Sequence, residues 1–203
     1  MIGIGSDHGG FQTKQIIIEY LENNHIHYHD YGTYNEESTD YPIYALQVGE
    51  AVRTKQIEKG ILVCTTGIGM EIACNKVKTV RCAKVDNVKE AYLTRFHNDS
   101  NVLALSSTHS KEEIIEIVKT FLETSFSNEE RHQRRIKLIT DKTILYILTT
   151  PISIWALDAL NIEGKFKKNR YYQSRILYLM ISLSLSYLTV NFFYDFFLNS
   201  KFI

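Results

Sequence analysis

The sequence predicts an α/β fold, a doubly wound sandwich in which helices cover both faces of a five-stranded parallel sheet. Short runs rich in β-branched residues alternate with helical patterns from Met1 to about Leu122, and this alternation is typical of parallel sheets joined by right-handed crossovers. From about Asp141 the composition shifts to Ile, Leu, Tyr, Phe, Ser and Asn. We therefore expect one domain over 1–140 and an unrelated apolar C-terminal extension over 141–203.

The first part of the chain holds two expected strands and two expected helices. Met1–Ser6 is short and β-like, and Lys14–Leu21 has the apolar spacing of a helix. Ile26–Tyr31 is the second strand. A second helix then opens at Asp40-Tyr41-Pro42, with Asp40 available as N-cap and the proline inside the first turn.

The next part repeats this alternation three times. Each expected strand is a short apolar run, and each is followed by a helical pattern, the last of which is strongly periodic. The expected strands are 60–65, 80–85 and 101–105, and the helices begin near Glu71, Asn87 and Lys111.

The third expected strand leads into the most informative turn of the chain. The apolar run Ile61–Cys64 is followed by Thr65-Thr66-Gly67-Ile68-Gly69-Met70 and a helix start. Ligands of open α/β sheets bind at such strand ends, and the outward N–H groups of a glycine turn suit an anion. The turn lacks the further residues of a dinucleotide fingerprint or a P-loop. Cys64 is thus a candidate nucleophile or base beside an oxyanion site, or else a small buried apolar side chain.

Other polar residues fall at the ends of expected elements. Asp7 and His8 follow the first strand, Asp40 opens a helix, and His97 ends one. We expect several of these ends to converge with Cys64 on one edge of the sheet. The alternative for Asp7 is a plain N-cap.

A basic segment follows the alternating region. Arg131 and Arg135 are four residues apart and share one face of an expected helix over 128–137. Two guanidinium groups on one face can grip a phosphate. The alternative is a solvated helix in which Glu129 and Glu130 pair locally with the arginines.

Composition narrows the class of protein. The 23 basic and 23 acidic side chains give a formal net charge of zero, so bulk charge does not indicate nucleic-acid binding. Cys64, Cys74 and Cys82 are odd in number and lack zinc-like spacing, which suits a reducing compartment. The N-terminus has no signal-peptide pattern, so we expect a cytoplasmic protein.

Six segments, in order and at matching spacing from Met1 to about Thr140, together resemble the ribose-5-phosphate isomerase B family. That family also contains the galactose-6-phosphate isomerase subunits. The six segments are Gly5-Ser6-Asp7-His8-Gly9-Gly10-Phe11, Thr39-Asp40-Tyr41-Pro42, Cys64-Thr65-Thr66-Gly67-Ile68-Gly69-Met70, Ile72-Ala73-Cys74-Asn75-Lys76-Val77, His97–Leu105 and Arg131-His132-Gln133-Arg134-Arg135.

The resemblance implies a Rossmann-like sandwich that acts as a homodimer, with sites at the subunit interface and neither metal nor cofactor. It implies interconversion of an aldose phosphate and a ketose phosphate, typically ribose 5-phosphate and ribulose 5-phosphate in the pentose phosphate pathway. Cys64 matches the family's base, and Thr66 and His97 match residues that open the sugar ring. The remaining matches are Gly67, Ile68, Gly69 and Met70 for the anion hole, Asp7, Asp40 and Asn98 for the sugar hydroxyls, and His8, Arg131 and Arg135 for the phosphate.

Three residues depart from the family pattern. Thr65 replaces a usual glycine and would be strained by about 1–3 kcal/mol if its φ must be positive. Thr108 replaces a frequent phosphate-binding arginine, and Glu71 replaces a serine and is the alternative base. These departures leave open a hexose-6-phosphate isomerase of the galactose or allose type, or a weakly active sugar-phosphate-binding protein. Cys64 together with His97 favours the pentose enzyme.

The extension carries two apolar stretches. Ile144–Leu160 is broken by Pro151 and Asp158, whereas Ile176–Tyr194 is uncharged and long enough to span a bilayer. Preceding basic residues would keep its N-terminal side in the cytoplasm. The alternatives to an anchor are a helix packed on the dimer and read-through past a lost stop codon. The basic residues are Lys165, Lys167, Lys168, Arg170 and Arg175.

Overall fold

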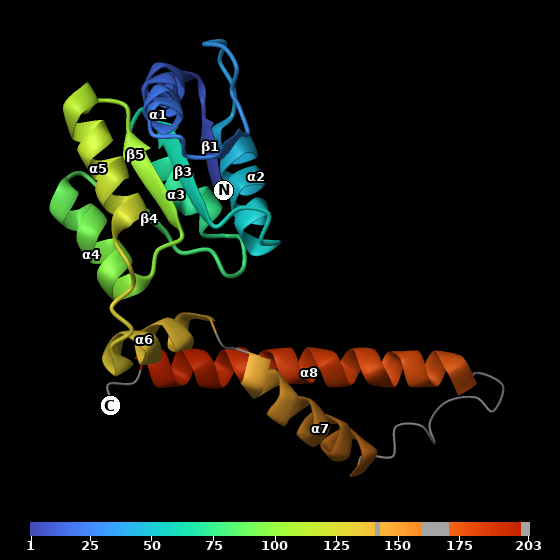
Figure 1. Cartoon of the computed structure of the whole chain (residues 1–203). Helices are drawn as coiled ribbons and strands as arrows, with labels where there is room; N and C mark the ends of the chain where they lie inside the picture. Colours follow the sequence, from blue (N-terminus) through green and yellow to red (C-terminus); the bar gives the residue numbers. More distant parts are fainter. Residues whose placement is uncertain (141–142, 160–170, 200–203) are drawn as a thin grey trace. The chain divides into compact units, whose positions relative to one another are not determined.

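A computed structural model describes residues 1–140, 143–159 and 171–199. The chain divides into two compact units, Met1–Lys137 and Leu138–Ile203, and each is described by itself. Figure 1 shows the strands gathered in the first unit and long helices in the second.

The first unit is built on a five-stranded sheet in the order β2-β1-β3-β5-β4. Every neighbouring pair is parallel, so the predicted sheet is confirmed. In its centre Ile4 lies opposite Ile61, and Val63 lies opposite Leu105. The strands are β1 (Ile2–Ser6), β2 (Tyr28–Asp30), β3 (Lys59–Cys64), β4 (Cys82–Lys84) and β5 (Val102–Ser106).

Helices cover both faces of this sheet (Figure 1). Alternation along the strands separates two cores, because successive side chains point to opposite faces. Leu62 belongs to the core under α2 (Tyr41–Arg53) and α3 (Ile68–Cys74), whereas Ile61 and Val63 belong to the other core. That second core is covered by α1 (Phe11–Asn23), α4 (Val88–Asn98) and α5 (Lys111–Glu123).

The elements differ from the sequence-based expectation mainly at their ends. The edge strands β2 and β4 are three residues long each, shorter than the expected 26–31 and 80–85, because each has one neighbouring strand to pair with. Helix α3 begins at Ile68, before the expected start near Glu71, since Gly67 already turns the chain with a φ of 77°. Asp40 occupies the N-cap of α2, although among the described residues its side chain accepts no hydrogen bond from the first turn.

After α5, the described residues form three more helices. Helix α6 (Glu130–Thr140) begins in the first unit, and α7 (Thr143–Ala159) and α8 (Tyr171–Asn199) pack on each other in the second. Pro151, which interrupts the apolar stretch 144–160 in sequence, lies inside α7 without ending the helix. Within α8 the stretch Arg175–Phe192 is long and apolar enough to cross a membrane, judged by length and composition. The expected basic residues Lys165, Lys167, Lys168 and Arg170 lie outside the described residues.

Candidate active site

The turn after β3 surrounds Cys64. This cysteine is the last residue of β3 and is 5% exposed, and its Sγ accepts a hydrogen bond of 3.1 Å from the N–H of Gly67. A Cβ on Gly67 would lie 3.0 Å from the carbonyl carbon of Leu105, and the φ of 77° already disfavours other residues. Glycine at this position therefore brings a backbone donor onto the sulfur.

The start of α3 continues the same turn. Gly69 and Met70 lie in its first turn, where N–H groups point outward from the helix, and the N–H of Ile68 donates to Thr66 Oγ1 at 3.4 Å. A Cβ on Gly69 would lie 2.8 Å from the ring of Tyr41, the first residue of α2. The α2 start thus packs directly against the candidate anion hole.

The turn after β1 lies beside them. Asp7 caps the short 3-10 helix His8–Gly10, with its Oδ1 accepting from the N–H of Gly10 at 2.9 Å. The cap expected as the alternative for Asp7 is therefore present. The carboxyl is 8% exposed, and burial raises its pKa. His8 Nδ1 accepts from the N–H of Thr39 at 3.3 Å, which holds the exposed imidazole next to Asp40.

Thr65, Glu71 and Thr108, which depart from the family pattern, also lie at the carboxyl edge of the sheet. Thr65 is not among the described residues with positive φ, so its backbone carries no such strain. Its carbonyl accepts from Ser106 Oγ at 2.7 Å, and Thr108 Oγ1 is 2.8 Å from the same hydroxyl. Glu71 Oε1 accepts from the N–H of Lys84 at 3.1 Å. The Glu71 carboxylate is therefore engaged at β4.

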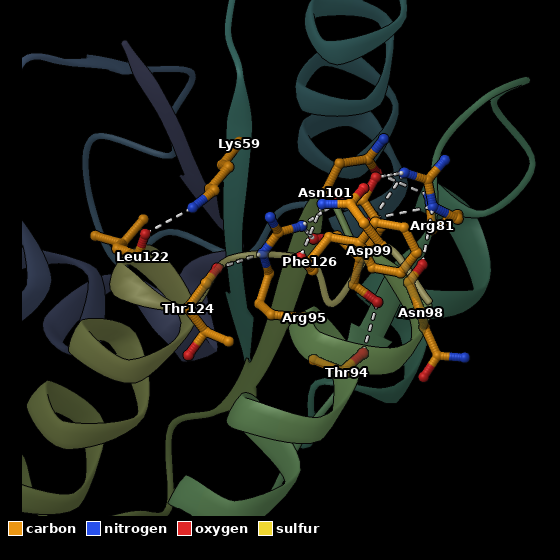
Figure 2. Close-up of polar contacts among 12 residues, drawn as sticks. Lys59, Arg81, Thr94, Arg95, Asn98, Asp99, Asn101, Leu122, Thr124 and Phe126 are labelled. Carbon is orange, nitrogen blue, oxygen red and sulfur yellow. Dashed lines mark hydrogen bonds and ion pairs between the residues drawn. The ribbon is translucent and has the colours of Figure 1, made fainter. Parts of the chain in front are cut away.

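A second group of candidates lies at the opposite edge of the sheet. His97 and Asn98 end α4, which leaves the carboxyl end of β4 and runs back to the start of β5. Arg81, which precedes β4, donates to the carbonyls of Asn98 at 3.1 Å and Asp99 at 2.9 Å. Figure 2 shows this cluster, with the Asn98 side chain directed away from it.

The expected convergence of His97 with Cys64 on one edge is therefore wrong within a single chain. A helix that connects two parallel strands must return to the edge where the next strand begins, so its last residues lie at the amino edge. Asp7, His8, Asp40 and Cys64 follow strands or open helices and share the carboxyl edge.

His97 has a neighbour that the sequence reasoning missed. The ring of His132 lies 4.5 Å from that of His97, and Ser127 Oγ is 2.8 Å from His132 Nδ1. His132 is 3% exposed, and burial lowers its pKa, which favours a neutral ring. In the sequence, the segment 131–135 stands out for its arginines. The spacing of residues within that segment does not indicate that His132 contacts α4.

Both candidate phosphate-binding arginines lie on α6. Arg131 and Arg135 are exposed, and Arg131 Nε donates to Glu129 Oε2 at 2.7 Å. The local pairing expected as the alternative is thus present for Arg131. Because His132 on the same helix contacts His97, α6 belongs to the amino-edge group.

Other features of the described residues add no further candidate to the site. A cavity of about 630 Å³ lies between β2 and α2, with Tyr31 and Tyr44 in its wall, and it includes none of the predicted site residues. Within the described ranges, His, Cys, Asp and Glu side chains form no group of three that could hold a metal ion.

Two different families match the regions before and after the change in composition near Asp141. Residues 2–139 match the family described as Ribose/Galactose Isomerase. Residues 151–194 match a different family, described as Protein of unknown function (DUF1146).

Individual relatives match the first region over nearly their whole length. The ribose-5-phosphate isomerase B of Escherichia coli is 40% identical over 140 residues, which are 68% of this chain and 93% of that protein. The solved Clostridium thermocellum ribose-5-phosphate isomerase B is 41% identical with a TM-score of 0.67, covering 68% and 94%. The Mycoplasma genitalium enzyme with bound ribulose-5-phosphate is 42% identical with a TM-score of 0.65, covering 68% and 93%. The chain therefore belongs to the Ribose/Galactose Isomerase family and is a sugar-phosphate isomerase.

Proposed function

We propose that the chain interconverts ribose 5-phosphate and ribulose 5-phosphate in the pentose phosphate pathway, with Cys64 as the base. The observation that carries this proposal is the geometry around Cys64, whose buried Sγ accepts a hydrogen bond from the N–H of Gly67. The related Mycoplasma genitalium enzyme, solved with ribulose-5-phosphate, supports the choice of sugar.

The chemistry assigned to Cys64 is a proton transfer. The thiolate takes the proton from C2 of the open-chain aldose and returns it to C1, while the hydroxyl proton moves from O2 to O1. Only a thiolate can act as this base, and the Gly67 N–H stabilises its negative charge. The N–H groups of the turn, among them those of Gly69 and Met70, stabilise the enediolate, and one such donor contributes roughly 3 kcal/mol.

The remaining carboxyl-edge residues bind the substrate in this proposal. Asp7 and Asp40 contact the sugar hydroxyls, His8 contacts the phosphate, and Thr66 assists ring opening. Their support is position, since Asp7, His8 and Asp40 lie on turns next to the one that follows Cys64. Thr66 lies on that turn itself.

The other half of the site comes from a second copy of the chain in a homodimer. His97, which opens the ring, lies on the edge opposite Cys64. Asn98, Arg131 and Arg135 lie on that edge as well. A two-fold axis perpendicular to the strands reverses the partner's sheet, so the partner's amino edge meets this carboxyl edge. Such a contact would cover apolar side chains that are 42–55% exposed on α2 and α3, namely Ile43, Leu46, Ile68 and Ile72.

A hexose 6-phosphate is the second candidate substrate, and a weakly active binding protein is the limiting case. Thr108 is the reason to keep these alternatives. Many family members have an arginine for the phosphate at this position, whereas the short Thr108 hydroxyl bonds to Ser106. The lack of this arginine would weaken the binding of any sugar phosphate, which is the case for the weakly active binding protein.

We further propose that the isomerase domain, residues 1–140, lies in the cytoplasm and that residues 176–194 contact a membrane. The uncharged sequence of this stretch and its helical structure in α8 support that contact.

The test is the rate of ribose 5-phosphate conversion by the full chain with EDTA present. Cys64→Ala should lower kcat at least a hundredfold with unchanged circular dichroism, whereas the matched control Cys82→Ala, at another buried cysteine, should keep activity. An active Cys64→Ala variant would move the base elsewhere, first to Glu71. A folded wild type that converts only hexose phosphates would replace the proposed substrate.

A further inference from the structure

In the described parts of α7 and α8, serines are among the few buried side chains, together with Leu157 and Val190, whereas many apolar side chains are exposed. On α8, Ser182 and Ser186 are 0% and 1% exposed, whereas Met180 and Leu183 are 60% and 51% exposed. Water-soluble helices show the reverse distribution, with an apolar stripe toward their partner and polar side chains outside. The pair is therefore built for surroundings less polar than water.

The contact between the two helices includes small polar residues. Ser186 on α8 donates to Ser153 on α7 with an Oγ–Oγ distance of 3.1 Å, and Ser153 is itself 5% exposed. The Tyr178 hydroxyl donates to the carbonyl of Ile154 at 2.6 Å. Small residues that let helices approach, joined by interhelical hydrogen bonds, are typical of helix pairs inside membranes.

The outer surface of the pair matches hydrocarbon in both chemistry and length. Ile152 and Trp155 of α7 are 62% and 74% exposed, and they add to the apolar surface of α8. The apolar window of α8 has 18 residues, which at 1.5 Å per residue is about 27 Å, close to the hydrocarbon thickness of a bilayer. Patches of this size on a water-facing helix are aggregation-prone.

We propose that α7 and α8 form a lipid-embedded helical hairpin, in which α8 crosses the hydrocarbon layer and α7 packs beside it through the Ser153–Ser186 contact. This inference rests on the membrane contact proposed for residues 176–194 and extends it from one helix to a pair. The occupant of the outer surface is the acyl-chain region of a bilayer.

The test of the lipid contact uses the full chain expressed in bacterial cells. The chain should remain in the membrane pellet after an alkaline carbonate wash and should float with phosphatidylcholine–phosphatidylglycerol vesicles after detergent removal. Leu183→Lys, on the outer surface, should lower the floated fraction by about tenfold or more, whereas Ser184→Ala should not. Extraction by carbonate, or failure to float, would overturn the lipid contact.

The test of the hairpin uses paired cysteines in those membranes. In Ser153→Cys/Ser186→Cys, copper–phenanthroline should oxidise the two thiols to an intrachain disulfide, and the chain should lose two sites for a polyethylene-glycol maleimide. The control Ile154→Cys/Ser184→Cys, at exposed positions, should keep both sites. Unprotected thiols or disulfide-linked dimers in the serine pair would overturn the hairpin. Isomerase turnover of the same samples reports separately on the proposed activity.

Discussion

Mixing two inactive variants should restore part of the activity if each site combines two copies of the chain. Cys64→Ala removes the proposed base at the carboxyl edge, and His97→Asn removes the imidazole at the amino edge. In a hybrid dimer one site loses both groups, while the other keeps Cys64 from one copy and His97 from its partner. Random exchange makes about half of the dimers hybrid, so about one quarter of all sites are intact.

The assay is ribose 5-phosphate turnover after the two variants are mixed in equal amounts and allowed to exchange. Activity should rise from the background of either variant to about a quarter of the wild-type rate. A control mixture of Cys64→Ala with the double variant Cys64→Ala/His97→Asn should stay at background. If the first mixture also stays at background although hybrids are detected by mass spectrometry, each site lies within one chain and the split site is wrong.

Three further variants test local features of the carboxyl edge. Gly67→Ala forces a Cβ residue to a φ of 77° and toward the Leu105 carbonyl carbon, so urea denaturation should show a loss of about 1–3 kcal/mol in unfolding free energy; an unchanged midpoint would contradict the strain. Burial raises the pKa of Asp7 from its usual 3.8, so the stability gained from its protonated form is present below that value and lost as pH rises through the folded-state pKa. Asp7→Asn keeps an acceptor for the Gly10 N–H but cannot ionise, so its stability relative to wild type should be greater at neutral pH than below pH 3.8; an equal difference at both pH values would refute this. Thr65→Gly relieves no strain, because the φ of Thr65 is not positive, and should lower stability by about 0.5–1 kcal/mol; a rise in melting temperature would show that the backbone is strained after all.

Local chemistry explains why some elements could be predicted closely. Helix α5 begins at the expected Lys111, because Ser110 and Glu113 form a capping box at its start, and its apolar face is regular. The strand before Cys64 was predictable because the central strand of a parallel sheet is apolar on both faces. The ends of the edge strands depend on a single neighbour, which local sequence does not encode.

The contacts of individual side chains could be predicted less well from the sequence. Glu71 competes with Cys64 as base on sequence grounds, yet its carboxylate accepts from the Lys84 N–H on β4. That bond depends on how α3 packs against a strand thirteen residues away. Likewise, the contact between His97 and His132 depends on α6 lying against the end of α4. Neither follows from spacing within a motif.

The position of the predicted site residues on two opposite edges could nevertheless have been inferred from the predicted elements alone. In a parallel sheet every strand ends at the carboxyl edge, and every crossover helix ends at the amino edge. Cys64 ends a predicted strand, whereas His97 ends a predicted helix. A residue at the end of a strand and a residue at the end of a crossover helix therefore lie on opposite edges of one sheet. They cannot meet within one chain unless a long segment brings one of them to the other edge. The family motif, mapped onto the strand and helix ends, therefore already favours a site completed by a second copy of the chain.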